Sequence, residues 1–205
     1  MKPKKLRNYE VWGLTGGIAA GQSTVAHILE ASGIPVVDAD QLARVLSSQD
    51  GLAHDDIMTR FGTSDRKSLR KIIFSDSQAR SDLEAILHPW IEKESTRCFE
   101  ELAESIRKRG VTKPVIVYEA ALLVETHRDQ TLDGLIVVES SPTDRQERLI
   151  QRDAISPSLA KSMIAAQISD EERRQAATEI LFNSGNLADL ETQVNELIHR
   201  RGWKA

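Results

Sequence analysis

A glycine-rich segment near the start of the chain carries the residue types best suited to chemistry. Residues 16–23 read Gly-Gly-Ile-Ala-Ala-Gly-Gln-Ser and match the pattern G-x-x-x-x-G-K-[ST] at every position except the lysine. In this pattern, glycines let the backbone wrap a phosphate, and successive N–H groups point at the anion. The following helix adds the positive end of its dipole. The predicted phosphate-binding residues are Gly16, Gly17, Ile18, Ala19, Ala20, Gly21, Gln22, Ser23 and Thr24.

Position 22 of this segment bears on turnover, because a neutral glutamine replaces the expected lysine. An amide still donates a hydrogen bond to a phosphate oxygen, but it brings no charge. Loss of one preorganised donor typically costs about 10²–10³ in rate. Three interpretations remain open: another cation acts instead, the protein binds its ligand with little turnover, or the glutamine was introduced deliberately. The hydroxyl of Ser23 is expected to bind Mg²⁺, with Thr24 as a less favoured substitute.

The elements that must position these residues are short apolar runs separated by helical patterns. Strands are predicted near residues 9–14, 34–37, 115–118, 135–138 and 179–182. Residues 41–109 show helical spacing only, broken at Asp50-Gly51, Phe61-Gly62 and His88-Pro89, with Pro89 in the first turn of a helix. A strand, a glycine loop, a helix and a second strand open a parallel α/β sheet. The fold class predicted from this pattern is α/β: a parallel β-sheet core with a P-loop and a helical insertion.

Composition excludes several other classes of protein. The chain has 205 residues, a formal net charge of −4 and 40% hydrophobic residues, which is typical of a globular domain and untypical of a nucleic-acid binder. Its single cysteine allows no intrachain disulfide and favours a reducing, cytoplasmic compartment. No apolar run is long enough to span a membrane. Residues 2–7 are basic and are expected to form a solvated tail.

An ordered set of motifs extends the pattern along nearly the whole chain. After the glycine loop come Asp38-Ala39-Asp40 and Ala43-Arg44, then Leu87-His88-Pro89, and later Leu122-Leu123-Val124-Glu125, Arg148, Arg152-Asp153, Gln167 and Asn183-Ser184-Gly185. In this order the motifs resemble the dephospho-coenzyme A kinase family. The resemblance implies transfer of the ATP γ-phosphate to the ribose 3′-hydroxyl of dephospho-coenzyme A, with Mg²⁺. It also implies a P-loop kinase fold with a core of about residues 8–40 and 112–205, a coenzyme A-binding insertion of about 41–111, and a lid of about 153–174.

The resemblance also assigns roles to individual side chains. Asp40 is expected to be the base that accepts the hydroxyl proton, with Asp38 as second choice. A competing interpretation is that Asp40 caps a helix beginning at Gln41. Glu119, which follows the third strand, is a further candidate for organising Mg²⁺, although this family usually has an aspartate there. The family's proline two residues later is replaced by Ala121.

Arginines near the lid are candidates for the missing charge. Arg148 and Arg152 lie four residues apart and therefore on one face of a helix. They are predicted to clamp ATP phosphates, and Lys161 is a third, less favoured candidate for this task. The predicted substrate-binding residues are His88, Glu125 and Arg44. For His88 a structural role before a helix-starting proline is the alternative, and for Glu125 a surface role.

Two rival functions stay open at the level of sequence. One is a kinase for another nucleoside or nucleotide, against which the Asp38-Ala39-Asp40 and His88-Pro89 motifs speak. The other is a catalytically weakened nucleotide or coenzyme A-binding protein, which Gln22 favours. The expected partners are dephospho-coenzyme A and ATP, without nucleic acid or membrane, and the oligomeric state is undetermined.

Overall fold

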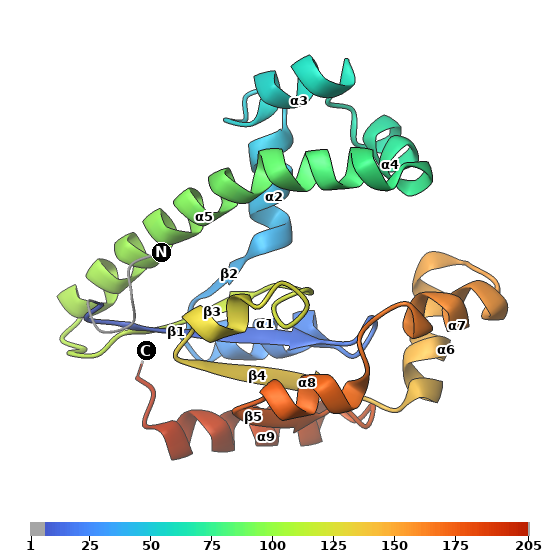
Figure 1. Ribbon diagram of the computed structural model, residues 1–205. Helices are drawn as coiled ribbons and strands as arrows, with labels where there is room; N and C mark the ends of the chain where they lie inside the picture. The colour runs from blue at the N-terminus through green and yellow to red at the C-terminus, as the bar shows by residue number, and fades with distance from the viewer. Residues whose placement is uncertain (1–6, 205) are drawn as a thin grey trace. The chain divides into compact units, whose positions relative to one another are not determined.

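The described part of the chain contains one five-stranded sheet and several α-helices (Figure 1). The computed structural model describes residues 7–204. The strand order is β2-β3-β1-β4-β5, and the β1–β3, β1–β4 and β4–β5 pairings are parallel. All five predicted strands are confirmed: β1 (Glu10–Gly16), β2 (Val36–Asp38), β3 (Val115–Glu119), β4 (Gly134–Glu139) and β5 (Glu179–Phe182).

Helices fill most of the remaining chain, and residues 41–109 contain no strand, as predicted. The α-helices are α1 (Gln22–Ala31), α2 (Ala39–Ser47), α3 (His54–Phe61), α4 (Arg66–Ser75), α5 (Ser77–Lys108), α6 (Pro142–Asp153), α7 (Pro157–Ala165), α8 (Asp170–Ala176) and α9 (Leu187–Arg201). A short 3₁₀ helix, η2, spans Arg128–Thr131. Within residues 7–204, no helix combines the length and apolar character needed to cross a bilayer.

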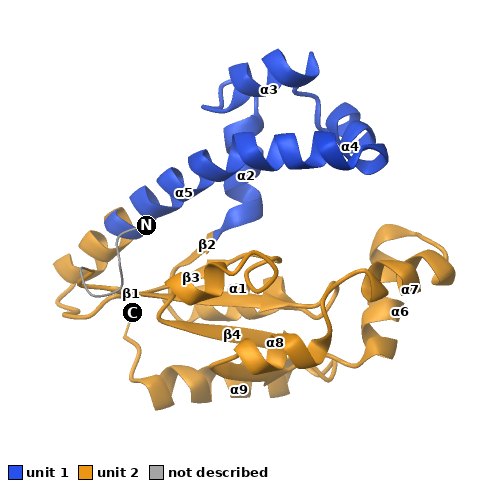
Figure 2. Ribbon diagram, in the orientation of Figure 1, with its two compact units in different colours: residues 1, 38–100 blue, residues 2–37, 101–205 orange. Residues whose placement is uncertain are grey.

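The chain divides into two compact units (Figure 2). Among the described residues, unit 1 is formed by residues 38–100 and unit 2 by residues 7–37 and 101–204. One boundary falls at the end of β2 and the other inside α5. Unit 2 therefore holds the phosphate loop, defined here as residues 16–23, whereas the acidic pair Asp38 and Asp40 belongs to unit 1.

The core of unit 2 lies between one face of the sheet and two helices. Trp12 and Leu14 of β1 point to one side, as do alternate residues of β3 and β4, and they meet the apolar faces of α1 and α9. Trp12 also packs edge-on against Trp203, with ring centroids 5.2 Å apart. This layer holds β1 rigidly, so the loop that follows its carboxyl end starts from a fixed position.

Unit 1 has a smaller core of its own, and one prediction about it is wrong. Pro89 was expected to start a helix, but α5 runs without interruption from Ser77 to Lys108 with Pro89 inside it. A proline there removes one helical hydrogen bond and crowds the preceding turn. Apolar residues on both sides of it, including Leu87 and Trp90, pack against the buried cluster of Leu46 and Ile57. This packing offsets the local penalty and keeps the helix continuous.

The basic tail is only partly described. Lys2, Lys4 and Lys5 lie outside the described residues, but Arg7 lies within them. The side chain of Arg7 is fully buried and donates to Asp133 Oδ2 at 3.0 Å and to Thr131 O at 3.2 Å. For Arg7, the expectation of a solvated side chain is therefore wrong, because a carboxylate beside η2 binds it.

Candidate active site

The phosphate loop has the backbone shape that its glycines predict. β1 ends at Gly16, and α1 begins at Gln22, so the loop joins a strand directly to a helix N-terminus. Gly21 adopts a left-handed conformation with φ of 105°, which glycine accepts without strain. A Cβ at Gly21 would lie 2.2 Å from Nδ2 of Asn183. Ala19 also has a positive φ, 60°, so a non-glycine residue holds a strained conformation within the loop.

Three side chains from distant parts of unit 2 hold the loop backbone. Asn183, after β5, donates from Nδ2 to Ala20 O at 2.8 Å. Arg148 on α6 donates from Nη1 to Ala19 O at 3.4 Å. The N–H of Ile18 donates to Gln167 Oε1 at 2.7 Å. These bonds order the loop, which lowers the entropy cost of forming an anion site.

The candidate metal ligands meet at the start of α1. Ser23 Oγ donates to Glu119 Oε1, at the end of β3, over 3.3 Å. Within residues 7–204, no group of three or more His, Cys, Asp or Glu side chains forms a metal site. A hydroxyl and a carboxylate fit Mg²⁺, which keeps several waters and takes its other ligands from phosphates. Thr24, one residue later, has its backbone N–H bonded to Gly21 O at 3.1 Å.

The two predicted arginines of α6 differ in their surroundings. Besides Ala19 O, Arg148 donates to Ser140 Oγ at 3.1 Å and to Asn183 O at 3.4 Å, so its guanidinium lies at the loop among neutral oxygens. Arg152 instead pairs with Asp153, from Nε to Oδ1 at 2.8 Å, and its side chain is 59% exposed. The structure therefore brings Arg148, but not Arg152, to the phosphate loop.

An ionic network built on two buried arginines adjoins the loop, and sequence reasoning missed most of it. Arg145 on α6 binds the Asp170 carboxylate through both Nη atoms, at 3.1 and 2.9 Å. Arg173 also binds Asp170, at 3.1 Å, and approaches Glu125 Oε1 at 3.4 Å. Arg145 and Arg173 are 4% and 2% exposed. Because buried guanidiniums need paired acceptors, this network fixes α8 and the segment after β3 relative to α6.

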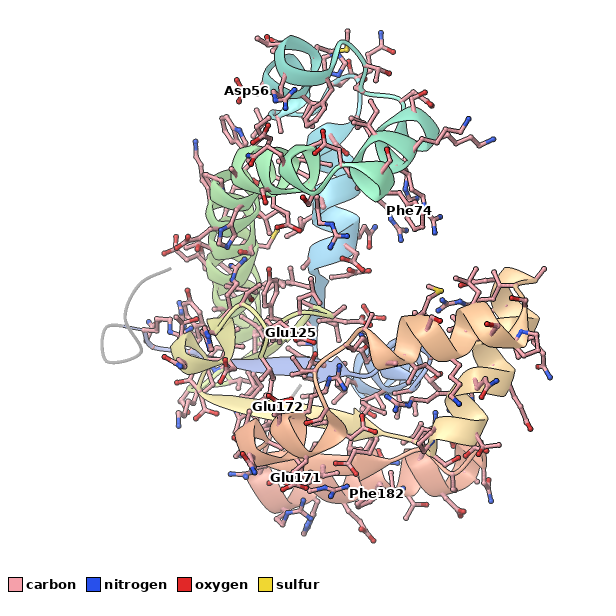
Figure 3. The ribbon with its side chains drawn as sticks, turned by 45° about the vertical axis from the view of Figure 1, so that its right-hand side comes forward. Asp56, Phe74, Glu125, Glu171, Glu172 and Phe182 are labelled. Carbon is pink, nitrogen blue, oxygen red and sulfur yellow. The ribbon has the colours of Figure 1, made fainter. Side chains whose placement is uncertain are left out.

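A pocket adjoins the loop on the side of Asn183. Its volume is about 430 Å³, a size suited to a small organic ligand. It opens at the carboxyl ends of β4 and β5, where open α/β sheets bind ligands. Its lining comprises Glu139, Ser140, Ser141, Pro142, Asp144, Asp170, Arg174, Phe182, Asn183 and Ser184. Phe182, labelled in Figure 3, is 55% exposed there and presents an aromatic ring.

The acidic pair of unit 1 divides its roles in an unexpected way. Asp38, not Asp40, caps a helix, because its Oδ1 accepts from the N–H groups of Asp40 at 2.7 Å and Gln41 at 3.1 Å. The helix, α2, begins at Ala39 and not at Gln41. The capping interpretation of Asp40 is therefore wrong, and its carboxylate is available for other chemistry.

Asp40 also has a perturbed acidity. Although the residue keeps a solvent-accessible face, packing around its carboxyl raises the pKa of Asp40 above the usual aspartate value, and the nearby Asp38 carboxylate raises it further. Arg44 and Arg66 act in the opposite direction and lower that pKa. A carboxylate with a raised pKa is a better proton acceptor than an ordinary aspartate.

Asp40 lies in a pocket of unit 1 that is rich in arginine. The pocket has a volume of about 420 Å³. Its lining comprises Asp40, Ala43, Arg44, Ser47, Ser64, Arg66, Leu69, Arg70, Ile73, Leu83 and Leu87. Arg66 and Arg70 lie one turn apart on α4, and Arg44 projects from α2. Three guanidiniums with one acid leave a positive excess, which suits a ligand with several negative charges.

The other two predicted substrate residues lie elsewhere. His88 is exposed in the interior of α5, and the arginine-rich pocket includes its neighbour Leu87 but not His88. The expectation that His88 precedes a helix start is wrong. Glu125, labelled in Figure 3, pairs with Arg173 and is 18% exposed. Its surface role is thereby contradicted, and its role toward substrate stays a prediction.

Known proteins resemble this chain over almost its full length. A model of the family described as dephospho-CoA kinase matches residues 10–189. The dephospho-CoA kinase of Geobacter sulfurreducens is 41% identical, over 92% of this chain and 97% of its own length. The corresponding protein of a Synechococcus strain is 34% identical, over 91% and 90%.

Solved structures agree with the sequence relatives. TT1252 from Thermus thermophilus matches with a TM-score of 0.76 and 29% identity, over 95% of this chain and 98% of its own. A dephospho-CoA kinase from Campylobacter jejuni has the same fold, with a TM-score of 0.63 and 24% identity. This match covers 95% of the present chain and 98% of the Campylobacter chain. The predicted P-loop kinase fold is confirmed. The chain belongs to the dephospho-CoA kinase family.

Proposed function

We propose that this chain transfers the γ-phosphate of Mg·ATP to the ribose 3′-hydroxyl of dephospho-coenzyme A in the cytoplasm. Its membership of the dephospho-CoA kinase family, with 41% identity over 92% of the chain to one relative, carries this proposal. Membership names the reaction class, and the geometry of each unit suggests which residues perform it.

Unit 2 binds the phosphate donor in this scheme. The N–H groups of the phosphate loop hold the β- and γ-phosphates, and Ser23 with Glu119 holds Mg²⁺. The pocket of about 430 Å³ beside Asn183 takes the remainder of the nucleotide. Asn183 serves both sites, since it lines the pocket and holds Ala20 O.

Unit 1 binds the phosphate acceptor. The arginine-rich pocket accommodates the diphosphate of dephospho-coenzyme A, with Arg44, Arg66 and Arg70 as the cations. Asp40 in the same pocket accepts the proton of the 3′-hydroxyl as the oxygen attacks phosphorus. The raised pKa of Asp40 supports this role, because the group is then better matched to a proton transfer near neutral pH.

The lid is the segment of about residues 153–174, which runs from the end of α6 through α7 into α8. Gln167, which follows α7, already contacts the phosphate loop at Ile18. Closure of this segment excludes water from the transferring phosphoryl group and suppresses ATP hydrolysis.

A coupled ADP-release assay tests the proposal. We expect turnover with Mg·ATP and dephospho-coenzyme A and little with nucleoside monophosphates at the same concentration. Turnover only with a nucleoside monophosphate would favour a different nucleotide kinase. Tight binding of both substrates without turnover would favour a binding protein, the alternative that Gln22 supports.

A further inference from the structure

Position 22 leaves the phosphate loop without its usual cation, and the structure helps to identify a replacement. Transfer of a phosphoryl group requires positive charge near the γ-phosphate, and this requirement rests on the proposed function above. Among the described residues, the Gln22 amide makes no hydrogen bond within the protein. The amide is therefore available to a ligand, but it supplies no charge.

The three cations that the sequence suggested as replacements for the lysine, Arg148, Arg152 and Lys161, are less well placed than Arg145. Arg148 donates hydrogen bonds to Ala19 O, Ser140 Oγ and Asn183 O, and these bonds hold the loop in shape. The Arg152 side chain is 59% exposed, so water screens its charge, and it bonds to Asp153 and not to the loop. Lys161 is exposed on α7.

Arg145 lies directly against the phosphate loop. A Cβ built on Gly17 would fall 1.8 Å from Nη1 of Arg145 and 3.0 Å from its Cζ. The guanidinium therefore occupies the space that a side chain at position 17 would fill. A side chain at position 17 would have to displace this guanidinium, whereas the backbone places no demand for glycine there, because Gly17 has no positive φ.

The surroundings of Arg145 preorganise its charge. The residue is 4% exposed, so little water screens it, and electrostatic interactions are stronger there than at the surface. Asp170 holds the guanidinium through both Nη atoms, and Nε is buried without a hydrogen-bond partner among the described residues. Asp170 itself is 40% exposed and lines the nucleotide pocket. Arg173 is similarly buried, but it bonds to Asp170 and Glu125 and not to the loop.

We propose that Arg145 supplies the positive charge that Gln22 lacks. It acts on the phosphates of bound ATP from the position that a side chain at Gly17 would otherwise fill. Its N–H groups not used by Asp170 are the donors for a phosphate oxygen. Arginine suits this position because it stays charged when buried, whereas a buried lysine loses its proton more readily.

The test is a cycle of variants at positions 22 and 145. Arg145→Gln should lower kcat by about 100-fold, the usual cost of one preorganised donor in phosphate or oxyanion stabilisation. Gln22→Lys alone should change kcat by less than about tenfold, since the charge is already present. In the Arg145→Gln background the same lysine should restore kcat to within about tenfold of the unmodified chain. A purely structural loss at Arg145 would not be restored by a lysine on α1.

Gly17→Ala gives a second route, in which Arg145 itself is not substituted. The new Cβ displaces the guanidinium from the loop, so kcat should fall by a larger factor in the unmodified chain than in the Arg145→Gln background. Arg173→Gln is the matched control, because it breaks an ion pair with the same Asp170 away from the loop. Gln22→Lys should not rescue the control. Rescue of Arg173→Gln, or an Arg145→Gln variant with kcat within about threefold of the unmodified chain, would overturn the proposal.

Binding of a non-hydrolysable ATP analogue with Mg²⁺, followed by calorimetry, separates this proposal from the choice of acceptor. Arg145→Gln should weaken that binding at least about tenfold, as expected for loss of a charged hydrogen bond, and Gln22→Lys should restore it. If the chain never phosphorylates dephospho-coenzyme A but shows this pattern, the proposed function fails and the role of Arg145 stands. Equal affinities of the unmodified chain, Arg145→Gln, Gln22→Lys and the double variant for the ATP analogue would refute that role.

Discussion

At the scale of single residues, two aspartates separated by one alanine have different tasks. Asp38 caps α2 with its carboxylate, while Asp40 lies in the arginine-rich pocket with a raised pKa. A cap stabilises a helix by satisfying N–H groups that otherwise have no partner, whereas a base must keep its oxygen lone pairs available. The two roles therefore predict opposite effects on stability and activity.

Asp40→Asn should lower kcat by about 100-fold or more through loss of the base, with little change in thermal midpoint. Asp38→Ala should instead lower the free energy of unfolding by about 1 kcal/mol through loss of the cap. Steady-state kinetics and thermal denaturation of both variants check this division. Comparable activity losses without any stability difference would show that the assignment of the two roles is wrong.

The pKa of Asp40 also has consequences for pH dependence. Because the base acts in its ionised form, kcat/KM for the acceptor should fall as pH drops through the raised pKa of Asp40. The folded state binds this proton more tightly than the unfolded chain, so the contribution of Asp40 to unfolding free energy decreases as pH rises from the usual aspartate pKa through the raised value. Asp40→Asn should remove both trends, measured by pH–rate profiles and by denaturation at several pH values.

At the scale of elements, the phosphate loop depends on helices and strands far from it in sequence. α6 contributes Arg145 and Arg148, the segment after α7 contributes Gln167, and the segment after β5 contributes Asn183. Unit 1 shows a similar dependence in α5, where tertiary contacts maintain a helix through Pro89. In both cases packing decides what local sequence alone leaves open.

Pro89→Ala should stabilise α5. A proline in a helix interior costs roughly 3 kcal/mol relative to alanine, so the free energy of unfolding should rise by about 1–3 kcal/mol after partial compensation. Urea denaturation followed by circular dichroism measures the change. A decrease in stability would mean that the packing of α5 in unit 1 requires the backbone geometry that proline imposes.

At the scale of the whole molecule, the two compact units divide the proposed reaction between them. Unit 2 carries the phosphate loop and the pocket beside Asn183, and unit 1 carries Asp40 and the arginine-rich pocket. If this division is correct, substitutions in each unit should affect one substrate selectively.

Arg66→Gln should raise the KM for dephospho-coenzyme A by about tenfold, since it removes one charged hydrogen bond, and leave the KM for ATP within about twofold. Asn183→Ala should do the reverse, because it frees the phosphate loop and alters the nucleotide pocket. Kinetics with each substrate varied in turn measure both constants. Parallel changes in both KM values for either variant would contradict the division.

The sequence by itself determined the strands, the phosphate loop and the family resemblance, because these depend on local periodicity, glycine positions and short spacings. It did not distinguish the tasks of Asp38 and Asp40, which depend on where α2 begins. Nor did it indicate Arg145, an arginine on a polar helix that most often would be solvated. Only the tertiary structure places that guanidinium against Gly17, because the contact joins residues more than a hundred positions apart and leaves no periodic signal in either segment.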